Sequence, residues 1–194
     1  MQKFFSALLF CSAVAASVNT SALTPTAVAV HNSDMEQVAR DPQSHSVRPV
    51  GWKAGGDLPF VFAAIGPSVA DAASGSYFAR LSTQNAASRG FWIVSDFISS
   101  SGKRQAVVNF SARTTFSDVR VSIHQFDAKW KELTVIDGAA INMTEQAWTR
   151  YAEKAGAQTF VLDPKAVTIE LAFSGLAQAG VSQFDIDAVS IELR

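Results

Sequence analysis

Residues 119–124 read Val-Arg-Val-Ser-Ile-His, and this stretch decides the fold class. Apolar residues occupy every second position, which is the period of a β-strand with one face against a core and the other in water. The three aliphatic residues are therefore expected to face inward, and Arg120, Ser122 and His124 to face solvent. The pattern favours an antiparallel sheet with one solvated face.

Comparable short runs flank this stretch on both sides, separated by turn signals rich in Gly, Pro, Asp and Ser. No long stretch has helical periodicity, so the chain is predicted to be all-β. Short strands at this spacing are typical of a two-sheet antiparallel β-sandwich of the jelly-roll type. The predicted strands are residues 77–81, 91–98, 105–113, 119–126, 159–162, 166–173 and 184–193.

The composition indicates one folded domain with little net charge. The chain has 194 residues, of which 48% are apolar, so it can bury a core and is not a disordered tail. Its formal charge is −1, and only 17% of its residues are charged. Because no strong positive field exists, binding to nucleic acid is not expected.

The first residues have the pattern of a secretory signal peptide. Met-Gln-Lys leads into an apolar run over residues 4–16, which ends in small residues. Removal of residues 1–22 is predicted, and cleavage after Ala15 or Ala16 fits the same pattern. The apolar run is shorter than the roughly 20 residues that a membrane-spanning helix needs, so no transmembrane segment is expected. The protein is therefore predicted to be secreted or periplasmic.

Cys11 is the only cysteine, and it lies within the predicted signal peptide. The mature chain is therefore expected to have no disulfide and no cysteine nucleophile. A lipoprotein anchor is disfavoured because the bulky Phe10 precedes this cysteine. Residues 23–31 are predicted to form a lead-in, partly linker and partly first strand, before a single domain over residues 32–194.

Several separated motifs occur in a fixed order along the chain. They are Asn-Ser-Asp-Met-Glu at 32–36, Pro-Val-Gly-Trp at 49–52, Ser-Gly-Ser-Tyr at 74–77, Trp-Thr-Arg-Tyr at 148–151, Phe-Val-Leu-Asp-Pro at 160–164, Val-Thr-Ile-Glu-Leu at 167–171 and Phe-Asp-Ile-Asp-Ala-Val-Ser-Ile at 184–191. In this order the chain resembles the jelly-roll carbohydrate-binding modules of the galactose-binding-like superfamily, those appended to xylanases and glucanases. It departs from the family pattern at Ser33, Met35 and Ala188, where the family has glycine, an aromatic residue and aspartate.

The resemblance implies a structural calcium ion where the opening and closing strands meet. By motif position, Glu36 and Asp187 are the expected carboxylate ligands, and Ca²⁺ is the expected cofactor. Hard cations of this kind need several oxygen ligands. The alternative is that Glu36 is a solvated strand end and that Asp187 caps a turn by accepting hydrogen bonds from backbone amides.

The resemblance also implies a sugar site, in which aromatic rings stack on the apolar faces of pyranose rings. Trp52 and Trp148 lie in family motifs and are predicted to belong to the core. Trp92 lies on the solvent face of its predicted strand, and Trp130 follows a break after a strand, so both are candidates for stacking. The alternative is that each packs under a loop, because tryptophan is highly buried on average.

Four polar residues are predicted to project from the same face as Trp92: Asp96, Arg113, Arg120 and His124. They have the chemistry to bind sugar hydroxyls or a uronic carboxylate. The alternative is an ordinary solvated sheet face, where charged side chains are common.

The expected function is therefore exported, non-catalytic binding of a polysaccharide or cell-surface glycan. An enzyme is not expected, because the three histidines have no metal-site spacing and neither an H-E-x-x-H nor a G-x-S-x-G pattern occurs. Two alternatives stay open. One is a structural or adhesive envelope or matrix protein that binds another protein, and the other is a polysaccharide lyase or hydrolase on a jelly-roll scaffold.

Overall fold

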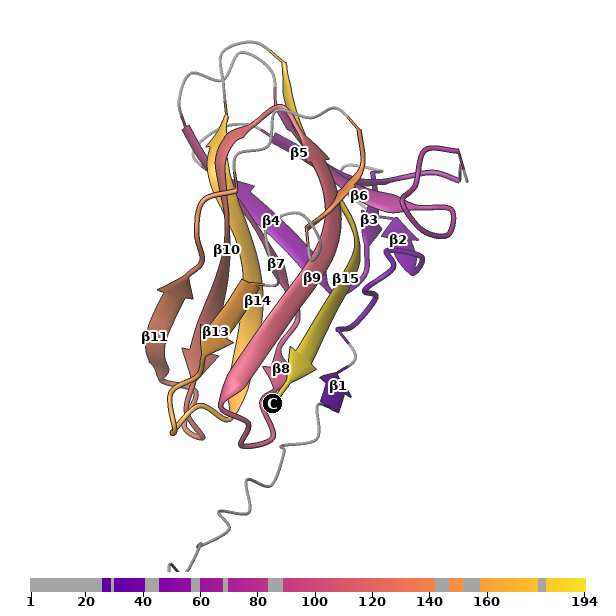
Figure 1. Ribbon diagram of the computed structural model, residues 1–194. Coiled ribbons are helices and arrows are strands. Elements are labelled where there is room, and N and C mark those ends of the chain that lie inside the picture. Colours follow the sequence, from indigo (N-terminus) through magenta and orange to yellow (C-terminus); the bar gives the residue numbers. More distant parts are fainter. Residues whose placement is uncertain are drawn as a thin grey trace, which may run out of the picture.

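The computed structural model is built almost wholly from antiparallel strands (Figure 1). Within the part of the chain that it describes, no helix is long and apolar enough to cross a membrane. The predicted signal peptide lies outside the described residues, so its prediction is unchanged. The structure describes residues 26–28, 30–40, 46–56, 60–67, 70–83, 89–141, 147–151, 158–177 and 181–194.

A seven-stranded sheet forms one layer. Its order is β12 (Thr149–Arg150), β9 (Gln105–Thr114), β15 (Ser182–Leu193), β6 (Phe78–Thr83) and β5 (Phe60–Ile65), with β1 (Thr26–Val28) paired to β15 and β13 (Gln158–Val161) paired to β9. β1 lies inside the predicted lead-in, so part of that segment belongs to the sandwich.

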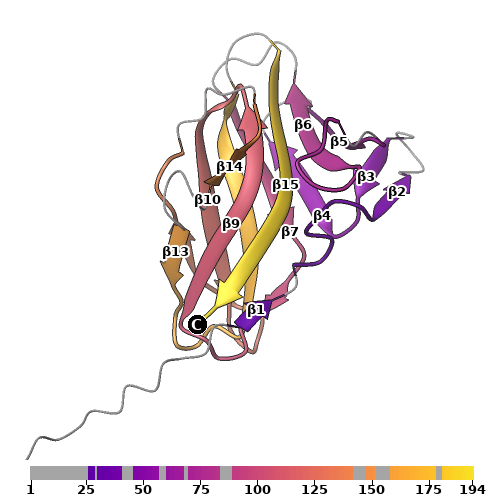
Figure 2. The same ribbon diagram turned by 45° about the vertical axis from the view of Figure 1, so that its right-hand side comes forward.

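A six-stranded sheet forms the second layer, and the two views of the ribbon show the layers face to face (Figures 1 and 2). Its order is β11 (Glu132–Asp137), β10 (Ser117–Phe126), β14 (Thr168–Ala177), β7 (Arg89–Ser95) and β4 (Trp52–Gly56), with β8 (Ile98–Ser99) paired to β14. A small hairpin of β2 (Val38–Arg40) and β3 (Val47–Pro49) lies beside the sandwich. The predicted all-β, two-sheet antiparallel sandwich is confirmed.

The core lies between the two sheets, as the alternation in β10 predicts. Val121 and Ile123 have no exposed surface, whereas Arg120 on the opposite side of the strand is exposed. The ring of Phe173 from β14 lies 5.0 Å from that of Phe110 and 6.0 Å from that of Phe184, both from the other sheet. These rings hold the layers together, because each aromatic side chain buries a large apolar surface on folding.

Each predicted run coincides with an observed strand, apart from small shifts at the ends. The run at 91–98 is divided, because β7 ends at Ser95 and β8 begins at Ile98. Sequence analysis missed β4, β5 and β11, and also the strands of two or three residues, β2, β3 and β12. β5 reads Phe-Val-Phe-Ala-Ala-Ile, which has no polar alternation, and the two glycines of β4 resemble a turn.

Candidate functional site

The solvent side of the six-stranded sheet carries side chains in register across neighbouring strands. Arg120 of β10 lies opposite Ser174 of β14, which lies opposite Trp92 of β7, which lies opposite Gly55 of β4. The next residues on the same side of these strands form a second row, parallel to the first. In the third row, His124 of β10 lies opposite Glu170 of β14. We call this surface the open face: Lys53, Gly55, Trp92, Val94, Arg120, Ser122, His124, Glu170, Ala172 and Ser174.

The open face is hollowed on either side of Trp92. One hollow of about 530 Å³ lies over β10, β14 and β7 and reaches Val135 and Asp137 of β11. A second, of about 580 Å³, lies at the edge of the sandwich between β4 and β5. Trp92 and Lys53 line both hollows and therefore form the ridge between them.

The indole of Trp92 is supported from below by a glycine. A Cβ added at Gly55 would overlap Cζ2 and Cε2 of the ring, so the ring lies directly across the backbone of β4. Trp92 nevertheless keeps 43% of its surface exposed. A glycine inside a strand often marks such a close approach. The result is an indole with one side against the sheet and the other side presented to solvent.

Two titratable side chains lie in the hollow beside Trp92. Nδ1 of His124 lies 2.7 Å from Oε1 of Glu132, which fixes the orientation of the imidazole. Glu170 is half-buried, and its side chain forms no hydrogen bond or ion pair with the described residues. Burial raises the pKa of Glu170, and the neighbouring His124 and Lys53 oppose that rise. Glu170 thus offers an unpartnered acceptor to whatever occupies the hollow.

Three of the predicted site residues lie on the open face as expected: Trp92, Arg120 and His124. Asp96 lies just past the end of β7, where its Oδ2 is 3.0 Å from Nδ1 of His31. This hydrogen bond raises the pKa of His31. Asp96 is therefore engaged with a neighbouring loop at the border of the open face.

The placement of Arg113 beside Trp92 is wrong. Arg113 belongs to β9 in the seven-stranded sheet, where its Nε donates to Oδ2 of Asp185 over 2.7 Å. The alternation within β9 correctly separates Arg113 from the core. It carries no information on which of the two sheets the strand joins, because that depends on pairing with distant strands.

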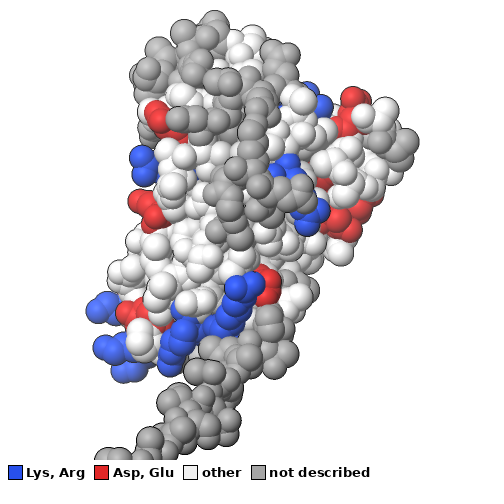
Figure 3. All heavy atoms as spheres, viewed as in Figure 1, with Lys and Arg blue, Asp and Glu red and all other residues white. Residues whose placement is uncertain are grey.

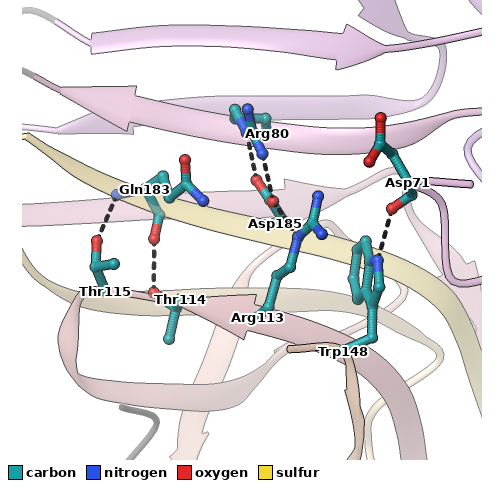
Figure 4. A network of polar contacts seen from close by, with 8 residues as sticks. All are labelled: Asp71, Arg80, Arg113, Thr114, Thr115, Trp148, Gln183 and Asp185. Carbon is teal, nitrogen blue, oxygen red and sulfur yellow. Dashed lines mark hydrogen bonds and ion pairs between the residues drawn. The ribbon is translucent and has the colours of Figure 1, made fainter. Parts of the chain in front are cut away.

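On the solvent side of the seven-stranded sheet, one carboxylate and two arginines form a charge cluster, and a tryptophan packs against it. Asp185 has no exposed surface and also accepts hydrogen bonds from Nε and Nη2 of Arg80, at 2.6 and 2.7 Å. The indole of Trp148 lies 4.8 Å from Cζ of Arg113, and its Nε1 donates to the carbonyl oxygen of Asp71 (Figure 4). We call this surface the covered face: Phe78, Arg80, Arg113, Trp148 and Asp185.

The two tryptophans predicted to lie in the core differ. Trp52 is 5% exposed and packs between the sheets, as predicted. Trp148 is only half-buried and lies on the outside of the seven-stranded sheet, so its assignment to the core is wrong. Trp130 is 62% exposed in the turn between β10 and β11, away from Trp92 in the sheet.

Asp187 is buried, and its oxygens are occupied by hydrogen-bond donors. Oδ2 accepts from the amide of Ser74 over 2.7 Å, and Oδ1 accepts from the hydroxyl of Ser74 and the amide of Ala188. Burial raises the pKa of Asp187, while these donors oppose the rise. This geometry is the turn-capping alternative, in which the carboxylate is satisfied by backbone amides.

Glu36 has a similar environment. Its Oε1 accepts from the amides of Ser76 and Tyr77, at 2.6 and 2.8 Å. Among the described residues no three His, Cys, Asp or Glu side chains gather in a group that could hold a metal. Because N–H donors point at these carboxylates, the arrangement does not fit a calcium ion, which needs free oxygen ligands. The calcium ion that the resemblance implies at Glu36 and Asp187 is therefore untested, and these hydrogen bonds favour the turn-capping alternative for Asp187.

Comparison by sequence finds no family model and no curated protein that matches the chain. Comparison by structure finds TmCBM61 in complex with β-1,4-galactotriose, with a TM-score of 0.53 at 15% identity over 86% of this chain and 99% of that one. The CBM22-1 xylan-binding domain from Paenibacillus barcinonensis Xyn10C has a TM-score of 0.55 at 13% identity, over 87% of this chain and 94% of that one.

Some structural neighbours are enzymes. The Stig cyclase Fisc from Fischerella sp. TAU has a TM-score of 0.60 at 12% identity, over 88% of this chain and 98% of that one. The chain also spans 20% of the enzymatically active domain of Bacteriophage CBA120 tailspike protein 4. The neighbours are nonetheless mainly carbohydrate-binding modules. The chain therefore has the β-sandwich fold of the jelly-roll carbohydrate-binding modules.

Proposed function

We propose that this chain is an exported, non-catalytic protein that binds a polysaccharide on its open face. The observation that carries the proposal is the exposed indole of Trp92, held across Gly55 at the rim of a hollow of about 530 Å³. A supported and half-exposed aromatic ring is a surface on which a pyranose can stack with little loss of side-chain entropy.

The polar groups around Trp92 supply the hydrogen bonds that such a ligand needs. The carboxylate of Glu170 is an acceptor with no partner among the described residues, so it can accept from sugar hydroxyls. Arg120 in the same row and Lys53 on the ridge are donors. Apolar contact to one ring face and hydrogen bonds at the ring edge together match the two kinds of surface of a sugar.

Among the structural neighbours, one is a complex with β-1,4-galactotriose and another is a xylan-binding domain. These two sugars suggest the first probes. We infer that the ligand is a polysaccharide or a cell-surface glycan, recognised by stacking on Trp92 and polar contacts with Arg120, His124 and Glu170.

The direct test is to titrate the purified chain with xylan, xylohexaose and β-1,4-galactotriose, with affinity read by calorimetry and by tryptophan fluorescence. Trp92→Ala is expected to weaken binding by about 1 to 3 kcal/mol, the scale of one buried aromatic contact. Val181→Ala is the matched control, because Val181 is 74% exposed and lies outside the open face. An unchanged affinity in Trp92→Ala would overturn the assignment of the site.

Export is part of the proposal and has its own measurement. The protein should be recovered outside the cytoplasm, and amino-terminal sequencing should give a chain that begins after residue 15, 16 or 22. Recovery of the protein with Met1 and Cys11 still present would contradict the signal peptide.

One observation favours a second candidate, a polysaccharide-active enzyme. The imidazole of His124 is oriented by Glu132 and opens into the same hollow as Glu170, which is an arrangement that a general base requires. Incubation with xylan or β-1,4-galactan, followed by an assay of new reducing ends, tests this candidate. Release of sugar ends that disappears in His124→Ala would favour the enzyme over the binding protein.

A further inference from the structure

The open face continues along its strands to a second group of aromatic rings. Phe126 follows His124 by two positions in β10 and therefore points to the same side of the sheet. The ring of Phe97 lies 5.3 Å from that of Phe126 and 5.1 Å from that of Trp130. We call these three residues the aromatic end. Phe97 is 51% exposed and Trp130 is 62% exposed, so the group presents rings to solvent.

The aromatic end and Trp92 lie on the same face but are separated along the strand direction. Arg120 marks the row of Trp92 in β10, and Phe126 lies six residues further along that strand. A strand rises about 3.3 Å per residue, so the two aromatic groups are roughly 20 Å apart. A single sugar ring cannot contact both.

The turn that carries Trp130 is held in one conformation. Oδ1 of Asp127 accepts from the amides of Lys129 and Lys131, at 2.8 and 3.0 Å, and the amide of Trp130 donates to the carbonyl oxygen of Asp127. These backbone hydrogen bonds lower the pKa of Asp127, so its charge persists in mild acid. Trp130 has a φ of +62°, a left-handed conformation that is unusual for a bulky side chain. Such conformations cluster at functional sites.

Hydrogen-bonding groups occupy the surface between the two aromatic groups. Ser122, His124 and Glu170 line the hollow beside Trp92. Thr168 of β14 lies opposite Phe126 of the aromatic end. Lys129 and Lys131 flank Trp130 in the turn. On the side of the molecule seen in Figure 3, which carries the seven-stranded sheet, Lys and Arg side chains also gather at the lower end. The face therefore changes from aromatic to polar and back to aromatic along the strands.

We infer that one extended glycan chain lies along the strands of the open face, with different sugar residues on Trp92 and on the aromatic end. This inference rests on the proposed function and narrows its ligand class. The ligand is an internal segment of a linear polysaccharide long enough to span about 20 Å, not a monosaccharide or a chain end alone. Phe97 and Trp130 form the second subsite, which is remote from the hollow at Trp92.

The test uses a ladder of xylose oligomers from xylobiose to xylohexaose, and the corresponding β-1,4-galactose oligomers. In the wild-type chain, affinity should rise with oligomer length in two steps. The second rise should occur at the length that reaches the second subsite. Trp130→Ala should remove that second rise, about tenfold for the longest oligomers, and leave the shortest oligomers unaffected. Phe97→Ala should act in the same direction. Val161→Ala is the matched control, because Val161 is 68% exposed but belongs to the other sheet.

The outcomes separate the inference from the proposed function. If Trp130→Ala and Phe97→Ala bind the longest oligomers and xylan as well as the wild-type chain does, while Trp92→Ala does not, the second subsite is wrong and the proposed function stands. If neither ladder nor xylan or β-1,4-galactan binds, or if Trp92→Ala has no effect on any probe, the proposed function fails and the inference fails with it.

Discussion

The open face and the covered face are built on the same scaffold, a row of four residues in register across four antiparallel strands. On the covered face the row is Arg113, Asp185, Arg80 and Ala63. On the open face the row is Arg120, Ser174, Trp92 and Gly55. In the first row opposite charges are neighbours and satisfy one another, whereas in the second the charge faces a hydroxyl and the aromatic ring faces a glycine.

This difference decides what each face does. The carboxylate of Asp185 is fully buried between two guanidinium groups, and Trp148 packs against one of them, that of Arg113, so this surface is committed to stability. No side chain among the described residues covers Trp92 in this way, and 43% of its surface is exposed. A sheet face can bind a ligand when its polar groups have no internal partners and no other side chain covers its aromatic ring.

The largest effect is expected on the covered face. Asp185→Ala leaves the guanidinium groups of Arg80 and Arg113 partly buried without their shared carboxylate, which should lower the free energy of unfolding by about 3 to 5 kcal/mol. Urea unfolding measures this loss. Arg120→Ala on the open face is the matched control, with an expected change within about 0.5 kcal/mol. Equal losses in the two variants would refute the contrast between the faces.

The second-largest effect is expected on glycan affinity, from a substitution at Gly55, where Trp92 lies across β4. Gly55→Ala places a methyl group in the space of the indole, so the ring must move. Glycan affinity should fall about tenfold, the scale of one aromatic contact, while the chain stays folded by circular dichroism. In the Trp92→Ala background the same change should have no further effect on affinity, because the two positions act through one contact. Additive losses in the double variant would show that Gly55 matters for another reason.

The two faces also show how far the sequence predicts this molecule. The alternation in residues 119–124 correctly predicts which side of β10 meets the core, because side-chain direction in a strand is set locally. The same reasoning correctly predicts that Arg113 points away from the core, but it wrongly places Arg113 on the same sheet as Trp92. Sheet membership depends on the pairing of β9 with β15, which is separated from it by most of the C-terminal half of the chain.

Two important residues of the open face were missed by sequence analysis. Gly55 is followed by a second glycine and an aspartate, which resembles a turn, although a glycine within a strand also marks close approach of a side chain. Glu170 lies on the solvent side of its predicted strand, between the inward Ile169 and Leu171, and that parity was the available signal. Its lack of a partner is a property of the packed neighbours in three dimensions.

A smaller effect, on pH dependence, is expected at Glu170. Because burial raises its pKa above the ordinary 4.5, the folded state holds this proton more tightly than the unfolded state does. The contribution of Glu170 to stability is therefore fully present below pH 4.5 and is lost as pH rises through the raised folded-state pKa. Glu170→Gln should remove this fall and show a higher melting temperature than the wild-type chain at pH 7.

The same variant sharpens the functional side of the comparison. If the ionised carboxylate accepts sugar hydroxyls, Glu170→Gln should weaken binding at pH 7 even as it stabilises the fold, and the wild-type chain should lose affinity in acid while the variant does not. Calorimetric titrations at several pH values measure this. A variant that gains stability and keeps full affinity would place Glu170 outside the site.

The smallest effect is expected from removal of calcium. A bound ion would stabilise the folded state in proportion to the logarithm of its concentration over its dissociation constant, so chelation would lower the melting temperature. In the present arrangement Asp187 accepts hydrogen bonds from Ser74 and Ala188, and Glu36 accepts from the amides of Ser76 and Tyr77. These donors satisfy the carboxylates without a cation, so EDTA should leave the melting temperature unchanged. A melting temperature that rises with added calcium, and no longer does so in Asp187→Asn, would instead show that the carboxylates exchange these amides for the ion.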